Sequence, residues 1–528
     1  MTENHTYCIP PWIASRSYFT GTEKARTIIT NSAWFMHLIL EETSSDLWSI
    51  LPRKFTIDAL RPLLPTVNID PEDGDNLNAV ADFLETLRAD GVLQVEGEDN
   101  PKPPPMKKVN VTELAGKTRF SEALEKEGLL PSSMVELTYR CSAKCVHCFN
   151  PRQQYNASND LTTQEVIKLI DDLYEVGVYE IAFSGGEASL RKDIFEILDE
   201  CRRLNITFQI FSNGLIPKEK VQRLISYYPH TIGVSIYSAN PDIHDATTRV
   251  KGSWKKSIET VKILVAAGIR VVLKNPIMQH TVHGYKAFLK LCDELGAVAQ
   301  CSINLTPTTE GDQRVYRHLV TNTNDLTQLF SDSQLTLGID INEPSGGQTT
   351  RSGNTSPCNA GITFLGVTPN GTVYPCVCLP ITVGNVREQS IIDIWKHSRP
   401  LAAWQSIVLN DFNECHLYPE CLFCDLCPGK ALLETDDTLG VAKTSCHAAK
   451  VKQDVAKQLA TGLNPATSET FGYDLSFREP ATILSEPDTR YSAHTSVDHT
   501  GENFVERIEN IKKNGNPVRK TITPTVIH

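Results

Sequence analysis

Short apolar runs alternate with amphipathic helical patterns through the middle of the 528-residue chain. The runs expected to form strands are 134–138, 180–183, 207–211, 231–236, 271–273 and 301–305, and the patterns expected to form helices are 163–176, 193–204, 219–228, 254–267 and 285–295. This alternation predicts an α/β domain over residues 131–311 with a parallel sheet, either doubly wound or curled into a barrel. Because ligands bind at the carboxyl ends of the strands in both arrangements, a functional site is expected there.

The rest of the chain divides into regions of different character. Residues 1–100 are expected to form a domain of their own, with extended stretches at 13–19 and 26–30, helices at 34–51 and 77–90 and a short strand after Gly91. We expect a proline-rich linker at 101–130 and a polar, turn-rich connector at 312–357. A cysteine-rich domain is expected at 358–450, followed by a tail at 451–528 that is partly helical or disordered.

Eleven of the fifteen cysteines are clustered, three at 141–148 and eight at 358–446. The chain carries neither a secretory signal pattern nor an apolar run long enough to span a membrane. In such a chain, clustered cysteines more often bind metal or carry out redox chemistry than form disulfides. The formal net charge of −12 argues against binding to a nucleic-acid backbone. We therefore expect a cytoplasmic metalloprotein that binds neither nucleic acid nor membrane.

Residues 141–148 read CSAKCVHC and place Cys141, Cys145 and Cys148 directly after the first strand of the α/β domain. Structural zinc sites and ordinary electron-transfer clusters use four protein ligands, whereas this site stops at three and leaves one metal position open. A zinc site completed by His147 is the alternative, but a ligand adjacent to Cys148 would strain a tetrahedral arrangement. Catalysis takes place at open positions, so these cysteines are predicted to be catalytic metal ligands.

The C-x3-C-x2-C spacing at the end of the first barrel strand resembles the radical S-adenosylmethionine superfamily. The resemblance implies a partial (β/α)6 TIM-like barrel and a 4Fe–4S cluster. Three of the four irons of this cluster would be held by Cys141, Cys145 and Cys148. The fourth iron would bind the amino and carboxylate groups of S-adenosylmethionine. One-electron reduction would then generate a 5′-deoxyadenosyl radical that abstracts hydrogen from a substrate. An electron donor such as flavodoxin or ferredoxin is implied as a partner.

Polar and glycine residues after the later strands resemble the family's contacts with S-adenosylmethionine. The candidates are Gly185, Gly186 and Glu187 after the second strand, Ser212 and Asn213 after the third, Ser235 in the fourth and Arg249 beyond it. By resemblance, Glu187 would pair with the amino group of the cofactor and Arg249 with its carboxylate. The alternatives are a common Asn-Gly turn at 213–214 and a solvated loop charge at Arg249.

Eight further cysteines lie between residues 358 and 446, enough for two clusters of four thiolates each. They are Cys358, Cys376, Cys378, Cys415, Cys421, Cys424, Cys427 and Cys446. A zinc ribbon built from the four cysteines of 415–427 is the alternative on spacing alone. The spacing of Cys358, Gly371 and Cys376 resembles the SPASM extension of radical enzymes, C-x9–15-G-x4-C. The resemblance implies two auxiliary 4Fe–4S clusters.

The resemblance also implies a ligand set for each auxiliary cluster. Cys358, Cys376 and Cys427 would hold the first cluster, and Cys415, Cys421, Cys424 and Cys446 the second. The later cysteines depart from the family's C-x2-C-x5-C-x3-C, because this chain has C-x5-C-x2-C-x2-C. The first set is one thiolate short, so either Cys378 supplies the fourth ligand, or an iron is open for substrate and Cys378 only packs in an apolar strand. In an extended segment Cys376 and Cys378 would share one face.

Residues 1–100 resemble the RiPP recognition element, a small winged-helix-like domain of ribosomal peptide maturases, through the segment SDLWSILPRKFTIDALRPLL and the later RADGVLQVE. In that family the leader of a precursor peptide adds as a strand to an exposed sheet edge. A winged-helix DNA reader is the alternative, which an acidic chain without clustered Lys or Arg in this unit disfavours.

Together the resemblances imply a SPASM-type radical enzyme that modifies a ribosomally made precursor peptide. The auxiliary clusters would accept the electron left after hydrogen abstraction, so the expected product is an oxidative crosslink, thioether or carbon–carbon. The second hypothesis is a leader-independent enzyme of the sulfatase-maturase or haem-pathway type, which would not need the N-terminal domain. The third is a non-enzymatic zinc- or DNA-binding protein, which would contain no iron or sulfide.

Overall fold

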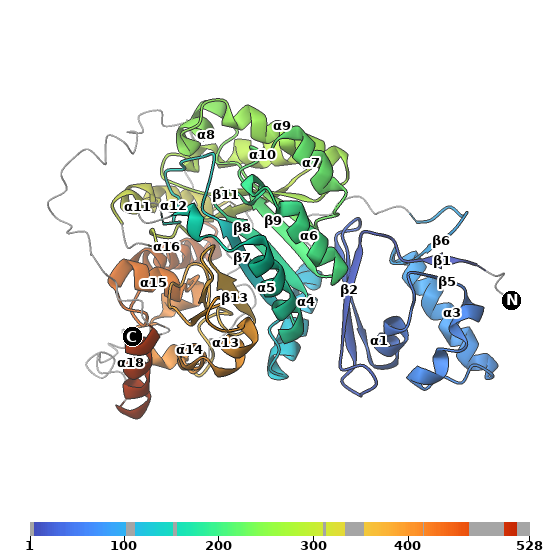
Figure 1. Ribbon diagram of the computed structural model, residues 1–528. Helices are drawn as coiled ribbons and strands as arrows, with labels where there is room; N and C mark the ends of the chain where they lie inside the picture. The colour runs from blue at the N-terminus through green and yellow to red at the C-terminus, as the bar shows by residue number, and fades with distance from the viewer. Residues whose placement is uncertain are drawn as a thin grey trace.

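The computed structural model describes residues 5–101, 111–151, 156–309, 313–332, 353–415, 417–463 and 501–514. Parts of the predicted connector and tail therefore lie outside the described residues. Figure 1 shows an N-terminal domain, a central α/β domain and a C-terminal part that packs beside the central sheet. Within the described ranges, no helix is both long enough and apolar enough to cross a membrane.

The central sheet has nine strands. They are β7 Ser132–Thr138, β8 Glu180–Gly185, β9 Thr207–Ser212, β10 Thr231–Ser235, β11 Val271–Pro276, β12 Val298–Ser302, β13 Phe364–Val367, β14 Thr372–Tyr374 and β15 Gly384–Asn385. Their spatial order is β12-β11-β10-β9-β8-β7-β13-β14-β15, with parallel pairing from β12 to β13 and antiparallel pairing beyond. The predicted α/β class with a partial parallel barrel is confirmed, and the cysteine-rich region extends the same sheet.

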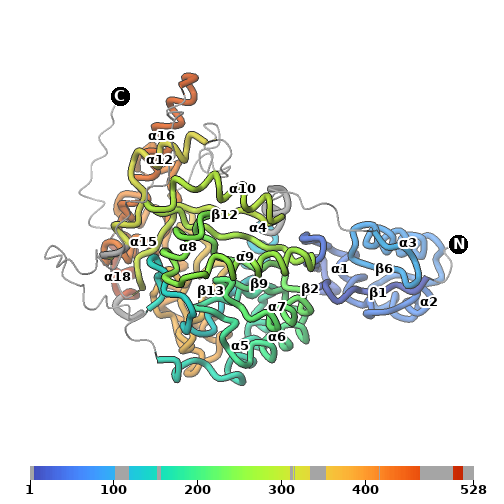
Figure 2. Tube along the Cα trace, turned by 90° about the horizontal axis from the view of Figure 1, so that it is seen from above, coloured from blue at the N-terminus to red at the C-terminus, as the bar shows by residue number. Residues whose placement is uncertain are grey.

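Helices connect the parallel strands and lie along one face of the sheet (Figures 1 and 2). They are α5 Thr163–Val176, α6 Ile194–Arg203, α7 Lys218–Ile225, α8 Pro241–Thr248, α9 Ser253–Ala266 and α10 Tyr285–Leu295. The start of α5 is a capping box, in which the Thr162 hydroxyl accepts from the Glu165 N–H and the Glu165 carboxylate accepts from the Thr162 N–H. Its end is Gly177, with φ 121°. These local signals explain why the sequence located this helix at both ends.

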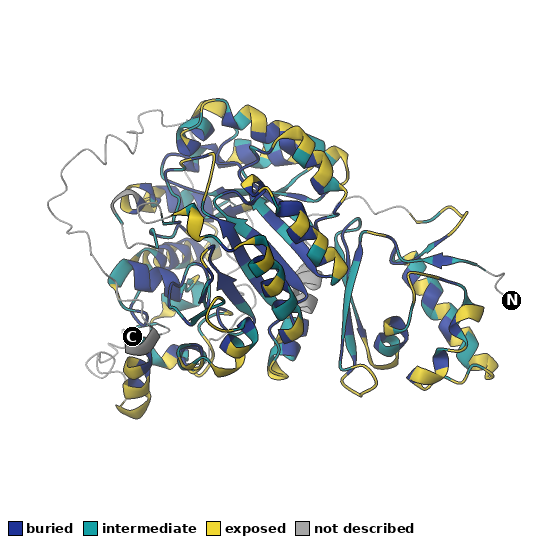
Figure 3. Ribbon diagram, viewed as in Figure 1, coloured by how far each residue is buried: buried dark blue, intermediate teal, exposed yellow. Residues whose placement is uncertain are grey.

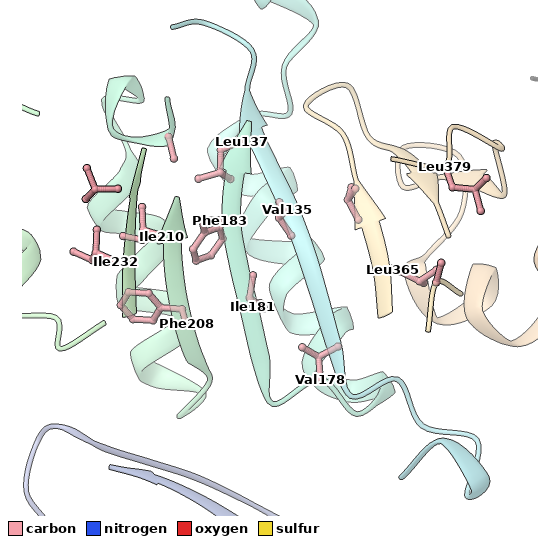
Figure 4. Packing of buried hydrophobic residues seen from close by; sticks show 14 of the residues in the cluster. Val135, Leu137, Val178, Ile181, Phe183, Phe208, Ile210, Ile232, Leu365 and Leu379 are labelled. Atoms are coloured by element: carbon pink, nitrogen blue, oxygen red, sulfur yellow. The ribbon is translucent and has the colours of Figure 1, made fainter. Parts of the chain in front are cut away.

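Side chains alternate between the two faces of the parallel strands, as the pleat requires. Val135, Ile181 and Phe183 are buried with helix side chains in the main apolar core (Figures 3 and 4). The opposite face, inside the barrel, carries small or polar residues such as Ser184 and Lys274, which line a cavity. The sheet therefore keeps its apolar core on the helix side and leaves the barrel interior for polar chemistry.

The N-terminal domain contains two small antiparallel sheets, β5-β1-β6 and β2-β3-β4. The strands are β1 Tyr7–Cys8, β2 Ile13–Tyr18, β3 Arg26–Asn31, β4 Met36–Glu41, β5 Lys54–Phe55 and β6 Gln94–Val95, and the helices are α1 Glu42–Ser49, α2 Ile57–Leu60 and α3 Gly74–Ala89. A separate apolar core, which includes Trp48 and Leu84, holds the domain together. These residues therefore form a folded unit with a core of its own.

The N-terminal domain packs on the amino ends of the barrel strands. The Tyr18 hydroxyl donates to the Gly177 carbonyl at 2.7 Å, and Arg16 donates to the Val178 carbonyl at 2.6 Å, both just before β8. Trp12 packs edge-on against Tyr228, just before β10, with ring centroids 5.8 Å apart. Helix α4 Val111–Lys126 closes the same end.

The C-terminal part of the chain adds further helices beside β13–β15. They are α11 Arg314–Leu319, α12 Thr323–Phe330, α13 Ile391–His397, α14 Arg399–Gln405, α15 Pro428–Thr435, α16 Lys443–Ala460 and α18 Gly501–Asn514. Most of the cysteines of this part lie in the turns between these elements, whereas Cys446 lies in the first turn of α16.

Four expectations about secondary structure were wrong in detail. Residues 36–41 form strand β4 rather than the first half of a helix at 34–51, because they pair with β3. The supposed linker contains α4, and the last barrel strand is Val298–Ser302 rather than 301–305. Residues 376–379 form a turn, in which the Leu379 N–H donates to the Cys376 carbonyl at 2.8 Å, and not an extended strand.

Candidate functional site

A cavity of about 710 Å³ lies at the carboxyl ends of the parallel strands. Its lining includes Cys141, Cys145 and Cys148 after β7, Gly185 and Gly186 at the end of β8, Ser212 and Asn213 after β9, and Ser235 in β10. The structure thus brings together all three cysteines of the 141–148 loop and most of the polar candidates from the later strands.

The cysteine loop is held in place by its backbone. The N–H groups of Lys144 and Val146 donate to the carbonyls of Thr248 and Thr247, at 2.9 and 3.0 Å. These two carbonyls lie at the last turn of α8, a helix that the sequence patterns did not predict. The loop is therefore anchored across the barrel mouth to the segment after β10.

Hydrogen-bond donors point at two of the three sulfurs. The Sγ of Cys141 accepts from the Ala143 N–H and from the Asn213 side-chain amide, each at 3.4 Å. The Sγ of Cys145 lies 3.6 Å from the Tyr237 hydroxyl. Burial raises the pKa of the Cys141 thiol, and the hydrogen bonds from Ala143 and Asn213 offset part of that rise. The thiolate is the form that binds metal.

The two glycines let β8 approach the cysteine loop closely. A Cβ on Gly186 would lie 2.4 Å from the Arg140 carbonyl oxygen, and a Cβ on Gly185 would lie 2.3 Å from that of Thr138. In this close packing the Gly186 N–H donates to the Thr138 carbonyl at 2.7 Å. Glycine is required here because the strand end and the start of the loop share the space that a side chain would fill.

Glu187 does not line the cavity, which differs from its predicted contact with the cofactor's amino group. It is fully buried, and its carboxylate accepts from the Ser212 hydroxyl and the Asn213 N–H, both at 2.9 Å, and from the Ser189 N–H at 3.3 Å. Burial raises the pKa of this carboxyl group above its usual range. Its hydrogen bonds fix the 212–213 turn beside Cys141, so Glu187 acts on the cavity through that turn.

The other two predicted cofactor contacts differ from each other. Ser235 lines the cavity at the end of β10. Arg249 lies at the end of α8 with φ 56°, is exposed and does not line the cavity. Its predicted pairing with a carboxylate therefore has no support in the arrangement of the described residues.

Tyr237 and Lys274 are two of several cavity residues that the sequence predictions missed. Tyr237 lies two positions after Ser235, so their period-2 spacing could have indicated a shared face. Lys274 is a single charge within an apolar strand pattern, and nothing local marks its environment. Both line the cavity because the sheet order brings β10 and β11 beside the cysteine loop.

Four cysteines of the C-terminal part lie close together behind the cavity. The side chains of Cys376 and Cys378 are hydrogen-bonded to each other, and the charges of Cys358 and Cys427 interact with this pair. Burial raises the pKa of Cys358 to about 12. Helix α15 reaches this group through Gly429, where a Cβ would lie 1.9 Å from the Cys378 carbonyl oxygen. Cys378 also lines the barrel cavity.

The remaining four cysteines form a second group. Cys415, Cys421, Cys424 and Cys446 line one cavity of about 210 Å³ between the 415–424 turns and α16. Burial and the neighbouring Cys421 raise the pKa of Cys446 to about 11. The structure thus divides the eight cysteines into two groups of four, with Cys378 in the first.

These residues fit thiolate-bound clusters. The donors at Cys141 and Cys145 suit thiolates, and among the described residues that line the barrel cavity there is no aspartate or glutamate. No group of three His, Cys, Asp or Glu in the described ranges is close enough to hold a single metal ion. In an iron–sulfur cluster each thiolate binds a different iron.

Two family models match the chain. The Radical SAM superfamily matches residues 135–294, and an iron–sulfur cluster-binding domain, SPASM, matches residues 358–428. The first match runs from β7 to α10 and includes the 141–148 loop, and the second includes every cysteine of the two groups except Cys446. They indicate 4Fe–4S clusters and S-adenosylmethionine as cofactors.

Similar proteins were found among sequences and structures. An AdoMet-dependent heme synthase of Methanosarcina barkeri is 27% identical over 289 residues, which are 50% of this chain and 81% of the relative. One of Oleidesulfovibrio alaskensis is 25% identical over 285 residues, 50% of this chain and 74% of the relative.

Among solved structures, Streptococcus suis SuiB bound to the precursor peptide SuiA matches with a TM-score of 0.51 and 16% identity, covering 83% of this chain and 99% of SuiB. The protein anSMEcpe with bound AdoMet matches with a TM-score of 0.50 and 15% identity, covering 67% of this chain and 98% of anSMEcpe. At these identities the likeness shows a shared fold.

Proposed function

We propose, from the premise that this chain is a radical S-adenosylmethionine enzyme with a SPASM domain, that it forms an oxidative crosslink, thioether or carbon–carbon, in a ribosomally made precursor peptide. The observation that carries the proposal is the separate N-terminal domain, whose small sheets have edge strands and which is attached to the barrel. The proposal is also supported by SuiB, a protein of similar fold that was crystallised with a precursor peptide.

In the barrel, the chain's part is to hold and orient the reactants. Cys141, Cys145 and Cys148 would hold the 4Fe–4S cluster, and Asn213 and Ser235 would contact S-adenosylmethionine from the neighbouring strands. When bound, this pair of cofactors supplies a radical that abstracts hydrogen from the substrate. The hydrogen bonds to Cys141 and Cys145 favour their thiolate forms. Glu187 is a positioning residue, because its carboxylate fixes the turn that carries Asn213.

The two groups of cysteines in the C-terminal part would hold two auxiliary clusters. The first set is Cys358, Cys376, Cys378 and Cys427, and the second is Cys415, Cys421, Cys424 and Cys446. We place Cys378 in the first set, because its side chain is hydrogen-bonded to that of Cys376 and interacts electrostatically with Cys427. Because Cys378 also lines the barrel cavity, the first set lies next to the place where the substrate would react.

The N-terminal domain would bind the leader of the precursor at a sheet edge. The outer strands of its larger sheet are β2 and β4, and a peptide that added to either would be held mainly by main-chain hydrogen bonds. Tethering the leader raises the local concentration of the core peptide at the barrel. A small reduced flavodoxin or ferredoxin would supply electrons.

A leader-independent activity of the haem-pathway type is the second candidate. It is favoured by the two heme synthases, which are about a quarter identical over half of this chain. The candidates differ in the N-terminal domain, because an enzyme without a leader-bearing substrate has no evident use for a docked peptide-binding unit.

The test uses the full chain with its clusters loaded under anaerobic conditions, and its candidate substrate is any short precursor peptide found encoded beside it. We expect a product lighter by two hydrogens, formed together with 5′-deoxyadenosine, and a core peptide without its leader should react poorly. Mass spectrometry and chromatography measure both products. If the precursor is unchanged while S-adenosylmethionine is still cleaved, the peptide reading is wrong. Equal rates with and without the leader would favour the second candidate.

A further inference from the structure

Two lysines line the barrel cavity together with the proposed cluster thiolates. Among its described lining residues, Lys144 and Lys274 are cationic and none is an aspartate or glutamate. Lys144 belongs to the exposed cysteine loop, whereas Lys274 lies within strand β11 on the inner face of the barrel. Lys274 is therefore the cation of the barrel wall that lies apart from the cysteine loop.

The side chain of Lys274 is directed across the barrel interior. Lys274 is in register with Ser235 on β10, and its stem passes over Gly233 on the same strand. A Cβ on Gly233 would lie 2.7 Å from Cε of Lys274. The ammonium reaches the ring of Phe211 on β9, with Nζ 3.3 Å from the ring centroid. Lys274 can adopt this position because Gly233 has no side chain to occupy the same space.

Lys274 has no anionic partner among the described residues. By contrast Lys452, which is also buried, donates to the carboxylate of Asp425 at 2.8 Å. Burial lowers the pKa of Lys274 to about 8, so the group is still mostly protonated at neutral pH. A largely buried cation is costly unless it is paired, and the ring of Phe211 offsets that cost only in part. The cation is therefore placed to be paired by a ligand.

The neighbouring residue Asn275 does not share this position. It is 2% exposed and alternates with Lys274 along β11, on the side of the buried Val271 and Leu273. The ligand that pairs Lys274 must therefore carry an anionic group, which within a peptide is the carboxylate of an aspartate or glutamate.

The side chain of Lys274 reaches deeper into the barrel than the candidate cofactor contacts. It lies over Gly233 and Phe211, which come before Ser235 and Ser212 on their strands. We therefore assign the carboxylate that meets Lys274 to the other reactant, and the binding of S-adenosylmethionine to a Lys274 variant tests this assignment.

We propose that Lys274 binds the side-chain carboxylate of an acidic residue of the substrate peptide. The inference rests on the proposed function and narrows it, because it makes an aspartate or glutamate at or beside the modified position part of what the enzyme selects.

The test compares variants of both partners in the cluster-loaded full chain. Lys274→Met keeps the apolar stem against Phe211 but removes the charge, and it should raise KM for the precursor about ten- to a hundredfold. Lys274→Arg should recover most of that loss. Lys255→Met, which removes an exposed lysine of α9, is the matched control and should leave KM unchanged. Replacing the selected Asp or Glu of the core peptide by its amide should raise KM of the unaltered enzyme by the same factor. With that altered peptide, Lys274→Met should not raise KM any further.

The outcomes separate the two proposals. If the unaltered enzyme does not modify the precursor, the proposed function fails and this inference fails with it. If it does modify the precursor but neither Lys274→Met nor any acid-to-amide replacement changes KM, only the inference is overturned. Tenfold weaker binding of S-adenosylmethionine to Lys274→Met, measured without peptide, would also overturn it, because the bound carboxylate would then be the cofactor's. Should Lys274→Met fail to fold, the peptide replacements on the unaltered enzyme decide alone.

Discussion

The amino ends of the barrel strands meet the N-terminal domain, whereas the carboxyl ends surround the cavity with the three-cysteine loop. At the amino end, polar side chains donate to protein acceptors, as Arg16 does to Val178 and Tyr18 to Gly177. At the carboxyl end, donors point at the sulfurs of Cys141 and Cys145, and Lys274 has no partner of opposite charge among the described residues.

This difference separates structural from chemical roles. Polar groups that are satisfied within the protein stabilise the docking of two domains. Polar groups that face a cavity without internal counter-ions keep their interactions for ligands. The same sheet therefore carries a closed end and a reactive end, in agreement with the general rule for barrels of parallel strands.

The largest effect is expected at the reactive end, from Cys141→Ala. Removing one of three ligands of a cluster with an open iron should abolish 5′-deoxyadenosine formation, while the auxiliary clusters remain. Iron content and product chromatography under reducing, anaerobic conditions measure both. Cys8→Ala, which removes a thiol from the N-terminal domain, is the control and should retain activity. Full 5′-deoxyadenosine production by Cys141→Ala would show that the reactive end has been misassigned.

Cys378→Ala tests whether the reactive end continues into the cysteine-rich part. The variant should alter the electron paramagnetic resonance spectrum of one auxiliary cluster and stop peptide product, but it should spare cleavage of S-adenosylmethionine. Cys301→Ala removes another buried cysteine, one that lies on β12 outside both groups of four, and serves as the control. An unchanged spectrum with normal product would mean that Cys378 only packs and that the first cluster has another fourth ligand.

Gly186→Ala tests the close approach of β8 to the cysteine loop. Its Cβ would lie 2.4 Å from the Arg140 carbonyl oxygen, so the loop must move. Displacement of reacting groups on this scale lowers rates about a hundredfold, and we expect that loss in 5′-deoxyadenosine formation. Gly74→Ala, at a position where nothing lies within 4 Å, should have no effect on it. Equal activity of the two variants would show that the loop tolerates the shift.

The smallest effect is expected at the closed end, from Tyr18→Phe. The variant loses the hydrogen bond to the Gly177 carbonyl and leaves that buried acceptor unpaired, at a cost of about 1–3 kcal/mol. Chemical denaturation should show the loss, with unchanged cleavage of S-adenosylmethionine. If cleavage fell as well, the two ends would be coupled and the separation of roles would not hold.

Local signals predicted the barrel well, and tertiary pairing explains the errors. Helix α5 was located correctly because Thr162, Glu165 and Gly177 mark its ends by themselves. Residues 36–41 were taken as helix because a short apolar run does not distinguish helix from strand. Only their pairing with β3, a contact formed in the folded chain, makes them a strand.

The site shows the same division. The spacing of Cys141, Cys145 and Cys148 is written in one loop, so the sequence reveals it directly. Lys274 gains its importance from Phe211 and Gly233, which lie on two other strands, and no local pattern reports on such neighbours. The sequence also could not predict which groups the Glu187 carboxylate contacts, because its donors Ser212 and Asn213 come from the next strand.

For the proposed leader-bearing substrate, the docking of the N-terminal domain at the amino ends would make the barrel set a minimum distance between leader and modified position. Strand β8 has six residues, which at about 3.3 Å each make the barrel wall roughly 20 Å deep. A peptide held at one end and modified at the other must run along the outside of that wall, which takes at least about six extended residues before it turns into the cavity. The enzyme would therefore require a minimum number of residues between the bound leader and the modified position. Residues closer to the leader than this could not reach the cavity, whatever their side chains.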